Sequence, residues 1–170
     1  MRRIVIVIVV LLFGALAAVR AGEPDIYLLE YQYFVPNRYF SNTAGGPDRQ
    51  LLTVINTVSE WKSLWASIEP RMDRDIAQTR PHPLPRIDFS RYSLLVAALG
   101  ENGGRSVAIE SIHNFGAEIN VSLVALHPGP GCVVTMDIRY PIALALIART
   151  DKPVDFGVTN AVATCENKAS

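Results

Sequence analysis

The sequence has few cysteines and histidines, and its basic residues do not outnumber its acidic ones. The first cysteine is Cys132, which excludes lipid attachment to a cysteine near the N-terminus. None of the three histidines (His82, His113 and His127) has a second metal ligand at the spacing of a zinc motif. The chain also has no Gly-x-Ser-x-Gly nucleophile elbow, phosphate-binding loop or dinucleotide fingerprint. We therefore expect no metal site, no cofactor and no catalytic residues.

Long apolar runs are absent except at the very start of the chain. Arg2 and Arg3 precede an uncharged run from Ile4 to Val19, and small residues follow at Val19 and Ala21. This pattern predicts a secretory signal peptide over residues 1–21. The run is shorter than the ~20 apolar residues of a membrane-spanning helix, so we expect no stable membrane anchor after cleavage. A retained anchor is the alternative. The predicted location is exported, either periplasmic or secreted.

Residues 22–170 are predicted to form a single domain. They contain thirteen basic and sixteen acidic residues, a net charge of −3. This balance gives no basic surface for nucleic acid. In an oxidising compartment, Cys132 and Cys165 are expected to form a disulfide. A reactive thiol or a metal-binding pair is the alternative.

Alternating and doubly apolar segments predict a fold rich in β-strands. The predicted strands are 26–35, 51–55, 92–99, 106–112, 117–126, 133–140, 142–148 and 154–158. The connections between most of them are short, which favours antiparallel neighbours. We expect an α+β fold, mainly antiparallel β, with a curled sheet of about six to eight strands and one covering amphipathic helix.

The helix is predicted from Thr57, where Thr57 and Glu60 have the spacing of a capping box. An apolar stripe then follows at helical spacing: Trp61, Leu64, Trp65 and Ile68. Such a stripe usually packs against a sheet. After the helix, the proline-rich stretch Arg80–Arg86 is expected to be extended, as a solvated connector or as a recognition arm.

A set of short motifs in the middle of the chain carries a family resemblance. The motifs are Trp61 with Leu64, Asp88-Phe89-Ser90-Arg91-Tyr92, Leu99-Gly100, Gly103-Gly104-Arg105-Ser106, Pro128-Gly129-Pro130-Gly131-Cys132 and Tyr140-Pro141. In this order, residues 56–149 resemble the C-terminal domain of PrcB, a subunit of a bacterial protease complex. The sequence departs from the family pattern at Arg105, where the family has an aromatic residue. The resemblance implies an exported accessory domain that binds or stabilises a protease or another envelope protein, without catalysis.

The residues expected to contact a protein partner lie in two predicted turns. They are Gly103, Gly104 and Arg105 in one turn and Pro128, Gly129, Pro130 and Gly131 in the other. Loops on a rigid sheet are usual sites of binding, although glycine and proline are also what tight turns require. We expect bulky residues at Gly129 and Gly131 to weaken binding without unfolding the sheet.

A small-ligand binding module is the alternative function. In that case, aromatic side chains would line a pocket between helix and sheet, namely those of Trp61, Trp65, Tyr27, Tyr31 and Tyr33.

Overall fold

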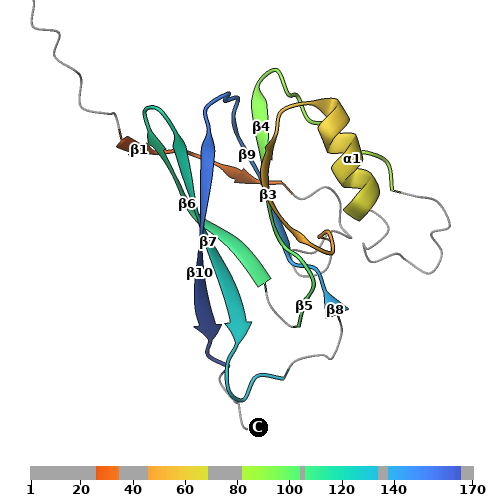
Figure 1. The fold of residues 1–170 in the computed structure, drawn as a ribbon, viewed down its shortest axis with the longest axis vertical. Coiled ribbons are helices and arrows are strands. Elements are labelled where there is room, and N and C mark those ends of the chain that lie inside the picture. Colours follow the sequence, from red (N-terminus) through yellow and green to blue (C-terminus); the bar gives the residue numbers. More distant parts are fainter. Residues whose placement is uncertain (1–25, 35–45, 69–81, 104–105, 134–137, 166–170) are drawn as a thin grey trace, which may run out of the picture.

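The structure is a computed structural model, and it describes residues 26–34, 46–68, 82–103, 106–133 and 138–165 (Figure 1). The signal peptide predicted over residues 1–21 lies outside these residues. The described elements, in chain order, are β1 (Ile26–Leu28), β2 (Gln32–Tyr33), β3 (Gln50–Ile55), α1 (Val58–Ile68), β4 (Tyr92–Leu99), β5 (Asn102–Gly103), β6 (Ser106–Phe115), β7 (Ile119–Pro128), β8 (Ile138–Arg139), β9 (Ile142–Ala148) and β10 (Val154–Ala163).

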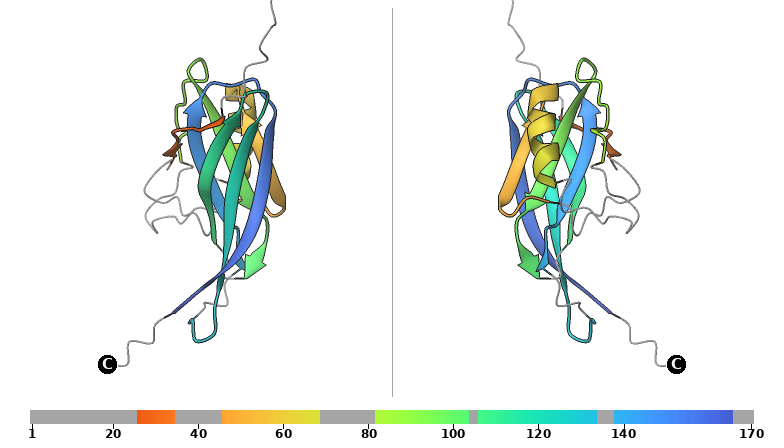
Figure 2. Two further views of the ribbon diagram at one scale, coloured as in Figure 1. Left: turned by 90° about the vertical axis from the view of Figure 1, so that its left-hand side faces the viewer. Right: turned by 90° about the vertical axis from the view of Figure 1, so that its right-hand side faces the viewer.

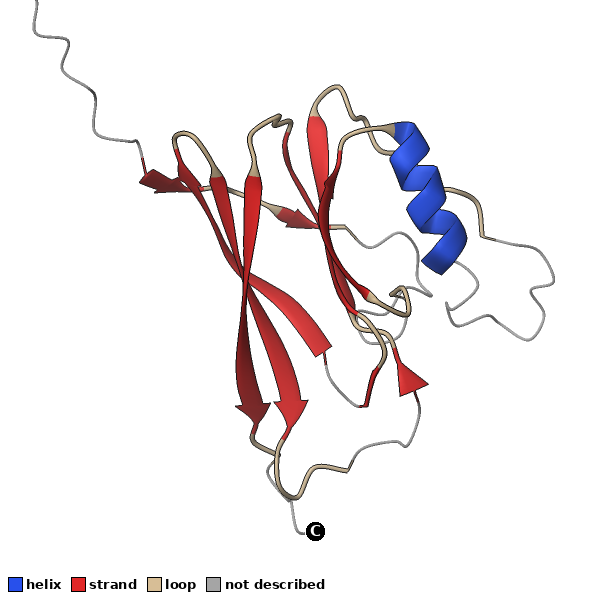
Figure 3. Cartoon of the chain, viewed as in Figure 1, coloured by secondary structure: helices blue, strands red, loops and turns tan. Residues whose placement is uncertain are grey.

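The strands form two main sheets, and the expected α+β fold, mainly antiparallel with one helix, is confirmed. Sheet A has the strand order β1-β6-β7-β10, sheet B has the order β2-β9-β4-β3, and β5 pairs with β8 separately. All of these neighbours are antiparallel except β7 and β10, which are parallel. Figure 3 shows the two sheets facing each other, with the helix on the far side of sheet B.

Strand β4 explains why the molecule has three layers. Its residues alternate between two apolar cores: Leu94 and Val96 pack with the helix, whereas Leu95 and Ala97 pack against sheet A. Strand β9 divides its residues in the same way, with Leu144 facing the helix. These two strands are apolar on both faces because both of their faces are covered, as the sequence predicted for 92–99 and 142–148.

The helix begins as its capping box predicts. The Glu60 N–H donates to Thr57 Oγ1 at 3.2 Å, and the Thr57 N–H donates to Glu60 Oε2 at 3.0 Å. The four stripe residues are all buried: Trp61, Leu64, Trp65 and Ile68. Both indole N–H groups are also satisfied, because Trp61 donates to the Pro85 carbonyl at 2.8 Å and Trp65 to that of His82 at 3.2 Å.

The segment after the helix is therefore not a solvated connector where the structure describes it. His82 is buried, and Leu84 packs against the core between α1 and sheet B. Here the expectation for Arg80–Arg86 is wrong in part, because its carbonyls and apolar side chains cover the two tryptophans. Arg80 and Pro81 lie outside the described residues.

The first predicted strand, 26–35, is two strands in different sheets. The Leu29 N–H donates to the Ile112 carbonyl of sheet A, and the Phe34 N–H donates to the Leu144 carbonyl of sheet B, each at 2.8 Å. Between these bonds the chain crosses from one sheet to the other. The alternation of polar and apolar residues continues through the crossing, so the pattern alone does not reveal it.

The last predicted strand, 154–158, is longer than expected and pairs differently. Strand β10 runs to Ala163, at the edge of sheet A beside β7 (Figure 2, left). The chain leaves sheet B after β9 and enters sheet A parallel to β7, with Val154 opposite Ile119. The short link from β9 to β10 joins two sheets, so it does not produce an antiparallel pair.

Candidate functional site

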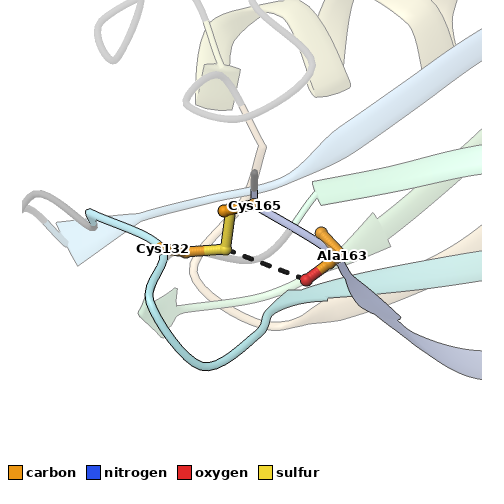
Figure 4. The surroundings of a disulfide bond; sticks show 3 residues. All are labelled: Cys132, Ala163 and Cys165. Carbon is orange, nitrogen blue, oxygen red and sulfur yellow. Dashed lines mark hydrogen bonds between the residues drawn. A yellow bond between two sulfur atoms is a disulfide. The ribbon is translucent and has the colours of Figure 1, made fainter. Parts of the chain in front are cut away.

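The predicted disulfide between Cys132 and Cys165 is present. It joins residues 33 apart in the sequence, with a Cα–Cα distance of 5.1 Å. Figure 4 shows that it ties the loop after β7 to the segment that follows β10, with the Cys132 sulfur 3.8 Å from the Ala163 carbonyl oxygen. A disulfide indicates an oxidising, exported environment.

The loop held by this disulfide is built from residues suited to a tight turn. Pro128 ends β7, and the Cys132 N–H donates to the Gly129 carbonyl at 3.2 Å. Gly131 has a φ of 83°, a left-handed conformation that favours glycine. Gly129 lies so close to Ala163 that a side-chain carbon would overlap the Ala163 carbonyl oxygen.

These contacts correct one expectation from the sequence. Bulky residues at Gly129 and Gly131 would not leave the structure intact, because Gly129 is in contact with the end of β10 and Gly131 needs a positive φ. Both glycines are required to form the loop, so their substitution cannot separate binding from folding.

The side chains that the loop exposes are apolar. Val133 is fully exposed, and Val162, which lies against Gly129, is 65% exposed. Pro130 is exposed as well. We call Pro128, Gly129, Pro130, Val133 and Val162 the loop surface. Sequence reasoning missed Val133 because it placed this residue at the start of the predicted strand 133–140; its position next to Cys132 was the available signal.

The other predicted contact turn lies at the same end of the molecule. Gly103 belongs to β5 and pairs with Ile138 of β8, and both strands lie at the lower end in Figure 1, as does the loop after β7. Gly104 and Arg105 lie outside the described residues. The helix begins at the opposite, upper end.

Sheet B separates the aromatic residues that were expected to line a ligand pocket. Trp61 and Trp65 are buried on the helix side, with ring centroids 5.4 Å apart. The hydroxyls of Tyr31 and Tyr33 instead donate to the Ile109 carbonyl of sheet A, each at 2.9 Å. Burial, together with the neighbouring Tyr33, raises the pKa of the Tyr31 hydroxyl. Tyr33 is 46% exposed, and these rings do not line a common pocket. The side chain of Tyr27 is not among those that the structure describes.

A hollow does exist between helix and sheet, but with a different lining. It measures about 680 Å³ and lies between β3 and the exposed side of α1. Three serines of the helix (Ser59, Ser63 and Ser67) line one wall, and Leu51 and Thr53 of β3 line the other. The serines recur every four residues, which places them on one side of the helix. That spacing was the signal available in the sequence.

The described histidines lie apart from one another in the fold. His127 Nε2 is 2.9 Å from Asn160 Oδ1, and His113 Nδ1 is 3.5 Å from Ser111 Oγ. Within the described ranges, no three metal-ligating side chains come together. No helix in the same ranges is long and apolar enough to cross a membrane.

Comparison with known proteins gives no relative. No protein-family model matches the chain. No curated protein matches it, and no solved structure matches it. The resemblance of residues 56–149 to the PrcB C-terminal domain therefore rests on the quoted motifs alone and stays a prediction.

Proposed function

We propose that this protein is an exported, non-catalytic accessory protein that binds a protein partner of the cell envelope through the loop surface. The partner class suggested by the motifs is a protease or another envelope protein, in the periplasm or outside the cell. The observation that carries the proposal is the disulfide between Cys132 and Cys165, next to the fully exposed Val133. A loop fixed in this way binds at a lower entropic cost than a mobile one.

The composition of the loop surface supports contact with protein. Its exposed side chains are valine and proline, and Val162 belongs to a strand, so that the surface includes a rigid element. An isolated exposed apolar residue is normal in soluble proteins, but neighbouring ones mark interaction sites. The net charge of −3 beyond residue 21 supports a partner other than nucleic acid.

A matched pair of substitutions tests the proposal. Val133→Glu adds a charge at the loop surface, and Val58→Glu adds the same charge at the start of α1, where the valine is 49% exposed. The mature protein would be crosslinked in its native envelope and captured. We expect wild type and Val58→Glu to retain one stoichiometric partner that Val133→Glu loses. Retention by Val133→Glu would refute the loop surface, and absence of a partner from wild type would refute the accessory function.

A small-ligand module is the second candidate, and the hollow beside β3 favours it. Its volume of about 680 Å³ lies within the range of ligand pockets, ~300–1,000 Å³. The Ser63 and Ser67 hydroxyls donate to the Ser59 and Leu64 carbonyls, so they offer a polar ligand their oxygen atoms as acceptors. Ser63→Trp would fill the hollow, whereas Lys62→Trp, at an exposed neighbouring position outside the lining, is the control. A ligand of this site raises the melting temperature of wild type and Lys62→Trp but not of Ser63→Trp.

A further inference from the structure

The four edges of the two main sheets are not equally protected. Natural sheets avoid edge-to-edge association by having short edge strands, or by placing prolines and charges on them. Edge strands β1 and β2 have three and two residues, and β3 has six. Strand β10 has ten residues, no proline and a single charge, Asp155. In the part of the chain that the structure describes, no strand pairs with its outer edge.

The direction of the backbone groups on β10 follows from one hydrogen bond at its start. The Ile119 N–H of β7 donates to the Pro153 carbonyl at 3.0 Å. Because backbone groups point alternately to the two sides of a strand, every second residue from Pro153 faces β7. Val158, Asn160 and Val162 therefore direct their N–H and C=O groups outward, to the unpaired edge.

The side chains around this edge are apolar or small. Val158 and Val162 are 37% and 65% exposed and lie on the same face of sheet A. Asn160 stands between them, with its side-chain oxygen 2.9 Å from His127 Nε2. Nothing lies within 4 Å of the place where Gly157 would carry a side chain, so the face of sheet A opposite the two valines is open at this residue.

We propose that β10 pairs antiparallel with β10 of a second copy of this chain, about a two-fold axis at Asn160. Sheet A then continues across the axis into sheet A of the other copy. Such an interface is isologous, meaning that the same patch serves both subunits. The proposal does not depend on the accessory function, since it concerns the edge of the sheet; the two surfaces have one residue in common, Val162.

The sequence of β10 is complementary to itself in this register. Val158 and Val162 are equally distant from Asn160, so each valine meets the other valine of the second copy. Val158, Asn160 and Val162 all direct their backbone N–H and C=O groups to the unpaired edge, as hydrogen-bonded antiparallel pairs require. On the opposite face, Gly157 meets Ala163, two small residues.

The charge pattern also favours a second copy as the occupant. Asp155 is the only charged residue of β10 and lies far from the axis, so that it meets Cys165 of the second copy and not another carboxylate. Like charges directly opposite each other on paired strands are destabilising, and this register avoids them. The disulfide at Cys165 fixes the end of the strand, so the edge is ordered before it pairs.

Analytical ultracentrifugation of the mature protein over micromolar to millimolar concentrations tests the proposal. We expect the average mass of wild type to rise toward that of a dimer. Val162→Lys places a charge beside the axis and should abolish dimerisation over the same range. Leu126→Lys, at a 38% exposed residue of the adjacent strand β7, is the control that should still dimerise. A wild-type protein that is monomeric throughout, or a dimer unaffected by Val162→Lys, would overturn the proposal.

Crosslinking tests the register itself. Asn160→Cys places two cysteines opposite each other at the axis, within the Cα separation that a disulfide spans. Leu126→Cys instead lies on the adjacent strand β7, one strand further from the axis in each copy. A covalent dimer is expected from Asn160→Cys under mild oxidation, and none from Leu126→Cys. Equal crosslinking of both variants, or of neither, would overturn the two-fold arrangement.

Discussion

Removing the disulfide should destabilise the protein by a predictable amount. The bridge closes a loop of 33 residues, from the end of β7 through β9 and β10. The chain-entropy relation for a loop of that length gives about 3.7 kcal/mol. For a chain of this size each kcal/mol changes the melting temperature by ~2–4 °C, so replacing Cys132 and Cys165 by serine should lower it by about 7–15 °C.

The two cysteines lie where their replacement by serine should disturb little else in the folded protein. Cys165 is exposed and Cys132 is half-buried, and neither belongs to the two apolar cores. Serine therefore leaves no large cavity, and the unfolded chain accounts for most of the effect. Urea unfolding of the oxidised protein, the reduced protein and the double variant is the assay. The variant should also have a larger m-value, because its unfolded state is less compact. A loss below about 1 kcal/mol with an unchanged m-value would refute the reasoning.

Three further predictions concern the helix cap and the core. Thr57→Ala removes the acceptor of the Glu60 N–H and should cost about 1 kcal/mol in urea unfolding; no loss would mean that the cap is not formed in solution. Hydrogen bonds from the Thr57 side chain and the Asn56 N–H lower the pKa of the Glu60 carboxyl. The stabilisation from Glu60 is therefore full above pH 4.5, and it is lost as the pH falls through that lowered pKa. The melting temperatures of wild type and Glu60→Gln should accordingly differ at neutral pH and converge in acid. Leu123→Ala, in the core between the sheets, should cost about 2–5 kcal/mol, and Leu126→Ala on the same strand much less, because Leu126 is partly exposed; equal losses would contradict the assigned faces of β7.

The elements predicted best were those specified by local physics. The helix has its own cap and an apolar stripe, and both are visible without knowledge of the rest of the fold. The doubly apolar segments 92–99 and 142–148 are β4 and β9 to the residue. A local turn is also present at Asp88, where the Ser90 N–H donates to the Asp88 carboxylate at 3.0 Å.

The features that were missed depend on which sheet a strand joins. Alternation of polar and apolar residues indicates that one face of a strand is buried and the other exposed. It does not indicate which sheet the strand joins, because strands of both sheets have a buried face. The crossing at Leu29 and the parallel pairing of β10 are therefore not encoded in the pattern of either segment. The end of β10 was missed for a related reason: Gly157 and Asn160 are poor strand formers, and the strand extends through them because it is paired with β7 as far as Ala163.

The candidate site was predictable in its chemistry but not in its construction. The cysteine pair could be inferred because an exported chain with two cysteines usually bridges them. That Gly129 touches the carbonyl of Ala163 could not be inferred, because the two residues become neighbours only when β10 lies beside β7. For the same reason, a glycine that looked free for substitution proved to be necessary for the loop.

The position of the disulfide connects the stability of the fold with both proposed surfaces. The two apolar cores already hold the middle of the sheets, where Leu123 and Leu144 are buried. They do not reach the far end of β10, where Val162 is exposed, so that end would fray without another restraint. The bridge at Cys165 supplies that restraint, and in doing so it orders the loop and the sheet edge together. An ordered, exposed apolar edge favours association with another chain unless it is covered. A bridge placed there therefore orders both proposed surfaces in addition to stabilising the fold.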